Sequence, residues 1–293
     1  MKLSDYLCCP KCKDKLISRQ SLLICRKCRS GYEIREGIPI LISLEEISGQ
    51  QQKQIDYFSD CRDMAETKYK LEEWHKSFLG RFKENFQDLK DKTVLDCGTG
   101  QGYMAIELAK EGATIIACDL TIQWLIRLKG IAKQEGLEEK ILFVCCSAEE
   151  LPIKSKSVDY FISNALLEHL EEEKKAISEI NRVCKKKSAL MITTPLLYRH
   201  LNPLLVPYSF IQDRVIGHLR RYDEESLVKV FKVFKGKLKN VYYTGHFQKV
   251  LITKIFTEIF GFERLAKMGE KIDRKNERKK IGASNICVFL QRS

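Results

Sequence analysis

A glycine-rich turn and an acid that follows it give this chain its clearest potential for chemistry. The apolar segment 94–97 enters Gly98-Thr99-Gly100-Gln101-Gly102, and a second apolar segment ends at Asp119. In an open α/β sheet, this succession of strand, turn, helix and strand places a nucleoside at the carboxyl ends of the strands, where the acid accepts hydrogen bonds from ribose hydroxyls. The glycine spacing is GxGxG rather than the GxGxxG that seats a pyrophosphate. Asp96 would repel a pyrophosphate but would suit a cationic amino acid.

The glycine loop resembles motif I of the class I S-adenosylmethionine (SAM) methyltransferases. Three further segments match the same pattern in order: Asp119-Leu120, the stretch 147–152 (SAEELP) and the stretch 158–170 (VDYFISNALLEHL). The resemblance implies SAM as the cofactor, held by Asp96, Gly98, Gly100, Gly102, Asp119, Leu120, Ser147, Ala148, Glu149, Asn164 and Ala165. Ser147 stands where the family usually has an acid, so the implied adenine contact passes to its hydroxyl and to the Ala148 amide.

The end of the stretch 158–170 is similar to the segment that ends the fourth strand in the type 11 branch of these enzymes. This similarity implies that Glu168 and His169 approach the substrate. Methyl transfer from a sulfonium mainly requires alignment and exclusion of water, and a base is needed only for a poorly acidic acceptor. His169, and after it His218, are the candidate catalytic residues, as a base or as an orienting group. A capping or core histidine is the alternative.

An insertion over residues 196–222 ends in Gly217-His218-Leu219-Arg220-Arg221-Tyr222. This ending resembles a segment of methyltransferases similar to those that act on quinones, lipid-linked or other small acceptors. Arg220 or Arg221 could pair with a carboxylate or phosphate of the substrate while Tyr222 packs the pocket wall. A loop anchored to the domain by an arginine is the other reading.

Two more segments could cover a site. The N-terminal stretch 55–89 has helical spacing, and the resemblance makes Tyr57 or Tyr69 a candidate to close over the cofactor. A second insertion, 248–282, begins with an apolar helix and turns basic from Lys267. A lid, a peripheral membrane contact, a dimer surface and ordinary core packing are all compatible with that composition.

Four cysteines near the N-terminus have the spacing of metal ligands. Cys9 and Cys12, then Cys25 and Cys28, form a CxxC…CxxC pair that suits a structural Zn²⁺; a redox CxxC and plain buried cysteines are the alternatives. With the segment 31–42 they resemble the Trm112-like zinc-ribbon family over residues 1–45. Four thiolates leave no open position on the metal, so we expect a structural site. The basic side chains around it indicate either contact with nucleic acid or a solvated surface.

The elements that position these residues alternate regularly. We expect strands at 93–96, 114–119, 141–145, 158–163, 189–194, 238–244 and 285–291, with helices at 102–111, 121–134, 171–184 and 223–234. This alternation predicts an α/β fold: a Rossmann-like, seven-stranded doubly wound sheet with a small N-terminal zinc-ribbon domain. We expect a ribbon at 1–45, a linker (45–54) and helical segment within 46–92, and a methyltransferase domain at 93–293.

Composition narrows the class of protein. The 293 residues carry a net charge of +12, which permits contact with nucleic acid or an anionic membrane surface. We expect a cytoplasmic protein, because no leader opens the chain and no run of about 18 apolar residues occurs. The sequence favours a SAM-dependent methyltransferase acting on a small-molecule or lipid- or quinone-like acceptor. An RNA methyltransferase and a non-catalytic SAM-binding scaffold are the alternatives.

Overall fold

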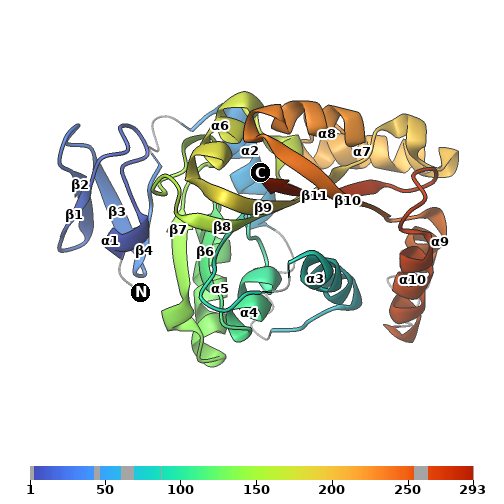
Figure 1. The fold of residues 1–293 in the computed structure, drawn as a ribbon, viewed down its shortest axis with the longest axis horizontal. Coiled ribbons are helices and arrows are strands. Elements are labelled where there is room, and N and C mark those ends of the chain that lie inside the picture. Colours follow the sequence, from blue (N-terminus) through green and yellow to red (C-terminus); the bar gives the residue numbers. More distant parts are fainter. Residues whose placement is uncertain (1–2, 43–46, 61–68, 87, 254–262, 293) are drawn as a thin grey trace.

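A mixed sheet runs through the middle of the molecule (Figure 1), and the glycine loop follows one of its inner strands. The computed structural model describes residues 3–42, 47–60, 69–86, 88–253 and 263–292. The strands are β5 (Thr93–Cys97), β6 (Thr114–Asp119), β7 (Ile141–Cys145), β8 (Val158–Asn164), β9 (Cys184–Pro195), β10 (Gly236–Thr244) and β11 (Asn285–Arg292). Their order in this seven-stranded sheet is β10-β11-β9-β8-β5-β6-β7. The predicted Rossmann-like fold is therefore confirmed.

The strand order creates a switch point beside β5. The strands from β5 to β9 pair in parallel, and β11 pairs antiparallel with both β9 and β10. The chain moves outward from β5 through β6 to β7, then returns to the other side of β5 to form β8. Loops that leave β5 and β8 therefore diverge at the carboxyl edge of the sheet. In open α/β sheets, ligands bind in the crevice at such a point.

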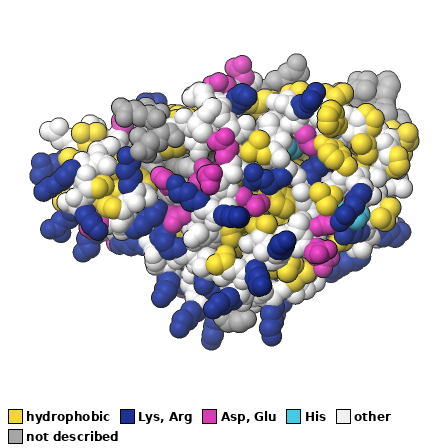
Figure 2. Space-filling view, turned by 90° about the horizontal axis from the view of Figure 1, so that it is seen from above, with side chains coloured by type: hydrophobic (Ala, Val, Ile, Leu, Met, Phe, Trp, Pro, Cys, Tyr) yellow, Lys and Arg dark blue, Asp and Glu magenta, His cyan; other side chains and the backbone are white. Residues whose placement is uncertain are grey.

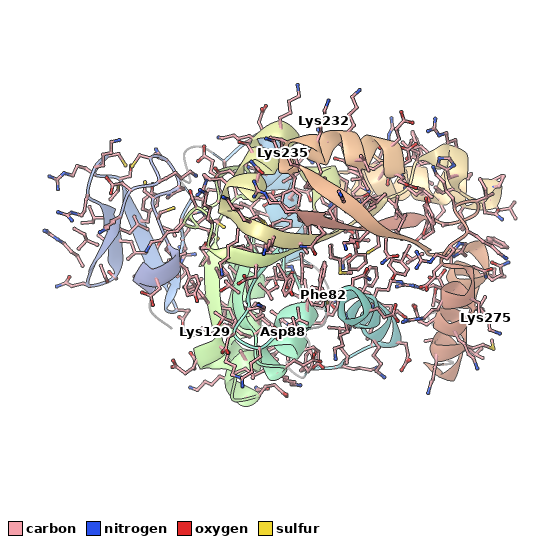
Figure 3. All side chains as sticks on the ribbon, in the orientation of Figure 1. Phe82, Asp88, Lys129, Lys232, Lys235 and Lys275 are labelled. Atoms are coloured by element: carbon pink, nitrogen blue, oxygen red, sulfur yellow. The ribbon has the colours of Figure 1, made fainter. Side chains whose placement is uncertain are left out.

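Each face of the sheet carries its own apolar core, because side chains alternate along a strand. Val94 and Ile115 belong to one core, whereas Leu95 and Ile116 belong to the other. The first core packs against α3 (Glu73–Asn85), α4 (Tyr103–Lys110) and α5 (Ile122–Gln134), and the second against α6 (Glu173–Val183) and α8 (Glu224–Val230). Figure 1 shows these helices on opposite sides of the sheet, and Figure 3 shows Phe82 pointing from α3 toward the strands.

The N-terminal residues form a second, smaller sheet. It follows α1 (Leu3–Tyr6) and has the order β1 (Leu16–Arg19), β2 (Leu22–Cys25), β3 (Gly31–Arg35) and β4 (Ile38–Pro39), all antiparallel. This small sheet lies beside the β7 edge of the large one (Figure 1). Two isolated bridges join the units, Leu7 to Ile153 and Ile40 to Cys145.

Helices outside the sheet cover its carboxyl edge and its β10 end. These are α2 (Gly49–Ser59), α7 (Val206–Ile216), α9 (Phe247–Leu251) and α10 (Glu263–Asn276). Short 3₁₀ turns occur at Glu138–Lys140, Ala148–Glu150, Leu167–His169, Tyr198–His200, Pro203–Leu205 and Phe231–Phe234. Within the described ranges, no helix is long and apolar enough to cross a membrane. The predicted apolar helix of the second insertion begins at Leu251 and Ile252, where the structure has the end of α9. Its other apolar residues, within 255–262, lie outside the described part of the chain.

The structure corrects the predicted linker. Residues 45–54 read as a polar connection, yet α2 begins at Gly49. The Ser48 hydroxyl accepts a hydrogen bond from the Gln51 amide, and the Gln51 side chain accepts one from the Ser48 amide. This reciprocal capping box starts a helix in spite of polar composition. The predicted helix 223–234 is also shorter, since α8 ends at Val230 and a 3₁₀ turn follows.

Candidate active site

The glycine loop leaves β5 at the switch point and forms one wall of a cavity of about 400 Å³. Gly98 and Gly100 line this cavity with φ angles of 72° and 46°, in the left-handed region that glycine adopts without strain. The amides of Gly98 and Thr99 both donate to the Cys118 carbonyl at 2.9 Å, which holds the turn against β6. A Cβ on Gly100 would meet no atom within 4 Å, so backbone faces open space there. A ligand can thus approach the loop closely.

Asp119 lies at the end of β6 and also lines the cavity. Its carboxylate accepts hydrogen bonds from the amides of Gly100 at 2.9 Å and Thr121 at 2.8 Å. Burial raises the pKa of Asp119, and those amide bonds act in the opposite direction. Two fixed donors orient the carboxylate while its remaining lone pairs stay available, as a ribose diol requires. The neighbouring Leu120 and Trp124 extend the same wall.

Asp96 and Gly102 are placed differently from the other predicted cofactor residues, because neither is among the described residues that line the cavity. Asp96 is 4% exposed beneath the loop and accepts a hydrogen bond from the Thr99 hydroxyl at 2.7 Å. Burial raises its pKa to about 6. Gly102 caps α4 at φ 75°, and a Cβ there would lie 2.2 Å from Leu128. Both residues support the loop, and their direct contact with a cofactor stays a prediction.

The segment after β7 closes the Asp119 side of the cavity. Ser147, Ala148 and Glu149 all line it. The Ser147 hydroxyl accepts a hydrogen bond from the Glu149 amide at 3.2 Å, which shapes the turn. The Glu149 carboxylate accepts from the Gln51 side chain at 2.9 Å and from the Glu172 amide at 2.8 Å. The predicted adenine segment is therefore next to the cavity, tied to α2 above it.

At the end of β8 the chain turns along the other side of the loop. Asn164 and Ala165 line the cavity, as the resemblance implied. The Asn164 amide group donates to the Tyr103 hydroxyl at 3.1 Å, and the Ala165 amide donates to the Thr193 carbonyl at 3.0 Å. Ala165 has a φ of 53°, unusual for a residue with a side chain. This turn feeds directly into the 3₁₀ turn Leu167–His169.

The helix that covers the cavity, α2, begins before the stretch 55–89 in which the sequence predicted a helical cover, and it covers the cavity with other residues than the predicted tyrosines. Gln51, Gln54 and Phe58 of α2 line it, whereas the predicted tyrosines are not among its described lining residues. Tyr57 is 38% exposed, and the Tyr69 hydroxyl donates to Glu107 at 3.1 Å. The Gln54 side chain donates to the Ile216 carbonyl at 2.9 Å and so joins α2 to α7. The capping box at 48–51 was the signal that could have revealed this cover.

The second side of the cavity brings together Glu168, His169 and His218, with ligand-capable atoms of all three within 4.8 Å of one another. The Leu219 amide donates to the Glu168 carbonyl at 2.7 Å, which brings the insertion onto the 3₁₀ turn. Glu168 is fully buried, and burial raises its pKa to about 8. Burial also lowers the pKa of His169 to about 3 and lowers that of His218. Burial therefore disfavours the protonated form of both imidazoles.

Asp213 of α7 organises the predicted substrate motif. Its carboxylate accepts from His218 Nδ1 at 2.8 Å and from Arg221 at 2.6 and 2.8 Å, and Tyr198 donates its hydroxyl as well. Arg220 bonds to the Leu170 carbonyl. These contacts are those of an anchored loop.

The motif also ends in a contact with the protein itself, since the Tyr222 hydroxyl bonds to Glu173. Arg221 lines a smaller neighbouring cavity of about 130 Å³. Among the described lining residues of the main cavity, Arg220, Arg221 and Tyr222 do not appear. Their predicted substrate contact stays a prediction.

The four N-terminal cysteines gather as the spacing predicted. Cys9 and Cys28 have their sulfurs 3.6 Å apart, and those of Cys12 and Cys25 are 3.3 Å apart. Four thiolates around one Zn²⁺ lie about 3.8 Å from one another, since each Zn–S bond is about 2.3 Å. The donor set and its spacing therefore fit zinc. Cys8 is buried nearby and is not a member of the group.

Comparison with known proteins agrees with this geometry. A family model described as a methyltransferase domain matches residues 95–192. Norajmaline N-methyltransferase of Rauvolfia serpentina is 33% identical over 125 residues, 42% of each chain. The tRNA 5-carboxymethoxyuridine methyltransferase of Escherichia coli strain K12 is 29% identical over 100 residues, 34% of this chain and 38% of that one. The chain thus spans about two fifths of the length of these relatives.

A solved structure supports the fold. The geranyl diphosphate C-methyltransferase of Streptomyces coelicolor A3(2), in complex with Mg²⁺, geranyl diphosphate and S-adenosyl-L-homocysteine, superposes with a TM-score of 0.62. It shares 9% sequence identity, and the match covers 84% of this chain and 98% of that one. Residues 95–192 therefore match a methyltransferase domain, and the chain shares its fold with that solved structure.

Proposed function

We propose that the protein transfers a methyl group from SAM to a small-molecule or lipid-like acceptor. The observation that carries this proposal is one continuous cavity, in which the glycine loop and Asp119 meet the group formed by Glu168, His169 and His218. The glycine loop and Asp119 follow β5 and β6, Glu168 and His169 follow β8, and His218 follows α7. Donor and acceptor would therefore meet beside the glycine loop. Methyl transfer requires this alignment.

The residues present fit the adenosyl and methionine parts of SAM. Asp119 would accept hydrogen bonds from the ribose hydroxyls, and Gly98 and Gly100 would lie against the methionine moiety. The Ala148 amide and the Ser147 hydroxyl would hold the adenine. SAM supplies a methyl group already activated on a sulfonium. The chain would supply alignment, and the apolar side chains that line the cavity beneath α2 would limit the access of water.

A small acceptor fits better than an RNA base. Phe58, Leu166, Leu170 and Ile216 give the acceptor side an apolar lining under α2 and the insertion. Apolar pockets with a few convergent polar groups are typical of small-molecule sites. The relatives include enzymes named for tRNA as well as for a small amine. An RNA acceptor is therefore the second candidate.

The cysteine group supports a structural role for the N-terminal unit. Cys9, Cys12, Cys25 and Cys28 would hold one Zn²⁺ with four thiolates, which leaves no position for a substrate. A unit of this size cannot bury a large core by itself, so metal binding would contribute much of its folding free energy. This zinc would stabilise the ribbon rather than take part in catalysis.

Calorimetric titration of the zinc-replete protein with SAM tests the proposal. We expect micromolar affinity and a loss of about 100-fold in Asp119→Ala, because charge-assisted hydrogen bonds to a diol contribute about 3 kcal/mol together. Asp88→Ala is the matched control, since the Asp88 side chain is 71% exposed on the far side of the domain (Figure 3). Thermal melting confirms that each variant folds. Absence of SAM binding by the folded wild type would overturn the proposal.

A further inference from the structure

Glu168 is a buried acid without a hydrogen-bond partner. Its side chain is fully buried, and neither carboxyl oxygen has a partner among the described residues. The positive charge of Arg221 acts on Glu168, but the Arg221 guanidinium already donates two hydrogen bonds to the Asp213 carboxylate. A buried carboxyl group that lacks hydrogen-bond partners destabilises the fold unless a ligand supplies them. The Glu168 carboxylate is therefore available to a ligand that lies in the cavity.

Two imidazoles lie beside this acid with nitrogens to offer. His169 Nδ1 is buried without a partner among the described residues. His218 donates its Nδ1 proton to Asp213 at 2.8 Å, which leaves the Nε2 lone pair free of that bond. The two rings meet edge to face with centroids 4.7 Å apart. A carboxylate behind a histidine is the arrangement that orients imidazoles for metal ligation.

The spacing suits a small divalent ion. One ligand atom from each of the three side chains lies within 4.8 Å of the others. Around an ion with metal–ligand bonds of about 2.1 Å, donor atoms lie up to about 4.2 Å apart. Side-chain rotations that move each ligand atom by less than about 1 Å would therefore bring all three into bonding distance of one ion. Two imidazoles with one carboxylate suit first-row transition metals and leave other coordination positions open. Those positions would face the cavity that the three residues line.

We propose that Glu168, His169 and His218 bind one divalent transition-metal ion, and that its open positions take the hydroxyl oxygen of the methyl acceptor. This inference rests on the proposed methyl transfer and narrows it to oxygen acceptors, such as phenols, enols or sugar alcohols. The metal lowers the pKa of a bound hydroxyl, and the proton leaves to solvent. An oxygen lone pair then forms the bond to the methyl carbon while the electron pair of the C–S bond stays on sulfur. The products are a methyl ether and S-adenosylhomocysteine.

This assignment also explains the insertion. Asp213 holds both His218 and Arg221, and the Leu219 amide bonds to the Glu168 carbonyl. The arginine motif would therefore position a ligand rather than contact substrate. Arg221 is a positioning residue in this view, and Asp213 is the outer partner of His218.

The test uses Mn²⁺ as the probe, because an ion that prefers oxygen and nitrogen ligands does not displace zinc from four thiolates. Zinc-replete protein is titrated with MnCl₂, and free Mn²⁺ is followed by its electron paramagnetic resonance signal. We expect one site per chain with micromolar affinity. Glu168→Gln, which keeps the shape of the side chain, should weaken binding at least about 30-fold, and His218→Gln should do the same. Glu225→Gln, an exposed glutamate in α8, should bind as the wild type does.

The outcomes separate the two proposals. Binding of one Mn²⁺ that both ligand variants lose, with melting curves like that of the wild type, supports the site. No binding by wild type that does bind SAM, or equal binding by Glu168→Gln, overturns the metal site and leaves the methyltransferase proposal intact. Asp213→Asn adds a readout for the outer partner: a fall in Mn²⁺ affinity of about 10-fold, as loss of such a partner typically produces, with unchanged SAM affinity.

Discussion

Asp96 and Asp119 stand at the ends of adjacent strands, and their surroundings assign them different roles. Asp119 lines the cavity with its carboxylate oriented by two backbone amides. Asp96 lies under the loop with the Thr99 hydroxyl as partner. Gly102 likewise acts below the surface, where its missing side chain lets α4 pack on Leu128. A loop that presents its backbone to a cavity needs such support from the residues beneath it.

Replacement of Gly102 should be costly. In Gly102→Ala the new Cβ would lie 2.2 Å from Leu128 at a φ of 75°, so both packing and backbone are strained. We expect a loss of about 2–4 kcal/mol in the free energy of unfolding. The control is Gly130→Ala, at an exposed position of α5 where an added Cβ would meet no atom within 4 Å. There alanine should raise the free energy of unfolding by about 0.5–1 kcal/mol. Urea denaturation measures both, and equal stabilities of the two variants would contradict this packing role.

Asp96 should make stability depend on pH in the ligand-free protein. Burial raises its pKa from 3.8 to about 6, so between these values the folded state holds more protons than the unfolded state. Stability is therefore lost as pH rises through this window, by up to about 3 kcal/mol. Asp96→Asn should abolish that loss, so that its free energy of unfolding rises relative to that of the wild type between pH 4 and 6.5. The free energy of unfolding of Asp88→Asn should change with pH as that of the wild type does. A constant difference between Asp96→Asn and wild type would show that Asp96 does not titrate as described.

At the scale of elements, the N-terminal unit supports the segment that is expected to hold adenine. The Cys8 amide donates to the Pro152 carbonyl at 2.9 Å, and the Lys154 amide donates to the Tyr6 carbonyl at 2.8 Å. Lys13 adds a contact with Glu179 at 2.7 Å. These bonds hold the chain on both sides of Ile153, three residues beyond the 3₁₀ turn Ala148–Glu150. Order in the ribbon is thereby coupled to one wall of the cavity.

Loss of the zinc site should consequently weaken SAM binding. In Cys12→Ala the ribbon loses a ligand and its bonds to 152–154, and we expect the dissociation constant of SAM to rise about 10-fold, equal to about 1.4 kcal/mol. Cys8→Ala, which removes a thiol outside the group of four, should keep one bound zinc and full SAM affinity. Zinc content by atomic absorption and calorimetry with SAM give both numbers. Unchanged SAM affinity in a zinc-free variant would disprove the coupling.

At the scale of the whole molecule, basic charge is scattered over the surface, whereas exposed apolar side chains are most abundant in one region. Figure 2 shows lysine and arginine side chains spread over much of the visible face, with acidic side chains among them, and hydrophobic side chains gathered at one end. The exposed apolar residues of that region belong largely to α7 and its flanks: Leu204, Tyr208, Phe210, Ile211, Val215 and Leu219. These residues belong to the insertion that closes the cavity, which is consistent with an apolar acceptor.

Scattered basic charge predicts weak, unspecific RNA binding. With a net charge of +12, RNA affinity should fall steeply between 50 and 200 mM salt, by about 10-fold or more, because released counterions drive it. The rate of methyl transfer to a small acceptor should change less than about twofold over the same salt range. Treatment with nuclease should leave that rate unchanged. Radiolabelled methyl counts in RNA and in organic extracts distinguish the two. Label found in RNA would favour the second candidate acceptor.

Local patterns determined much of the fold. Strands β6 and β7 were predicted to the residue, because a buried parallel strand is a short apolar run bounded by turn residues. The CxxC spacing determined the cysteine group, and the glycines with a following acid determined the loop and the place of Asp119 beside it in the cavity. These features depend on residues that are close in sequence, so that one stretch contains the information.

Only the tertiary structure decided which distant residues share the cavity. The sequence marked His169 and His218 separately, but the bond from Leu219 to Glu168 brings them together. It showed neither that Gln51, Gln54 and Phe58 are the residues of α2 that line the cavity nor that Asp213 binds Arg221. Such contacts join residues far apart in the chain through packing and hydrogen bonds. No local pattern encodes them, because either partner alone looks like an ordinary polar residue.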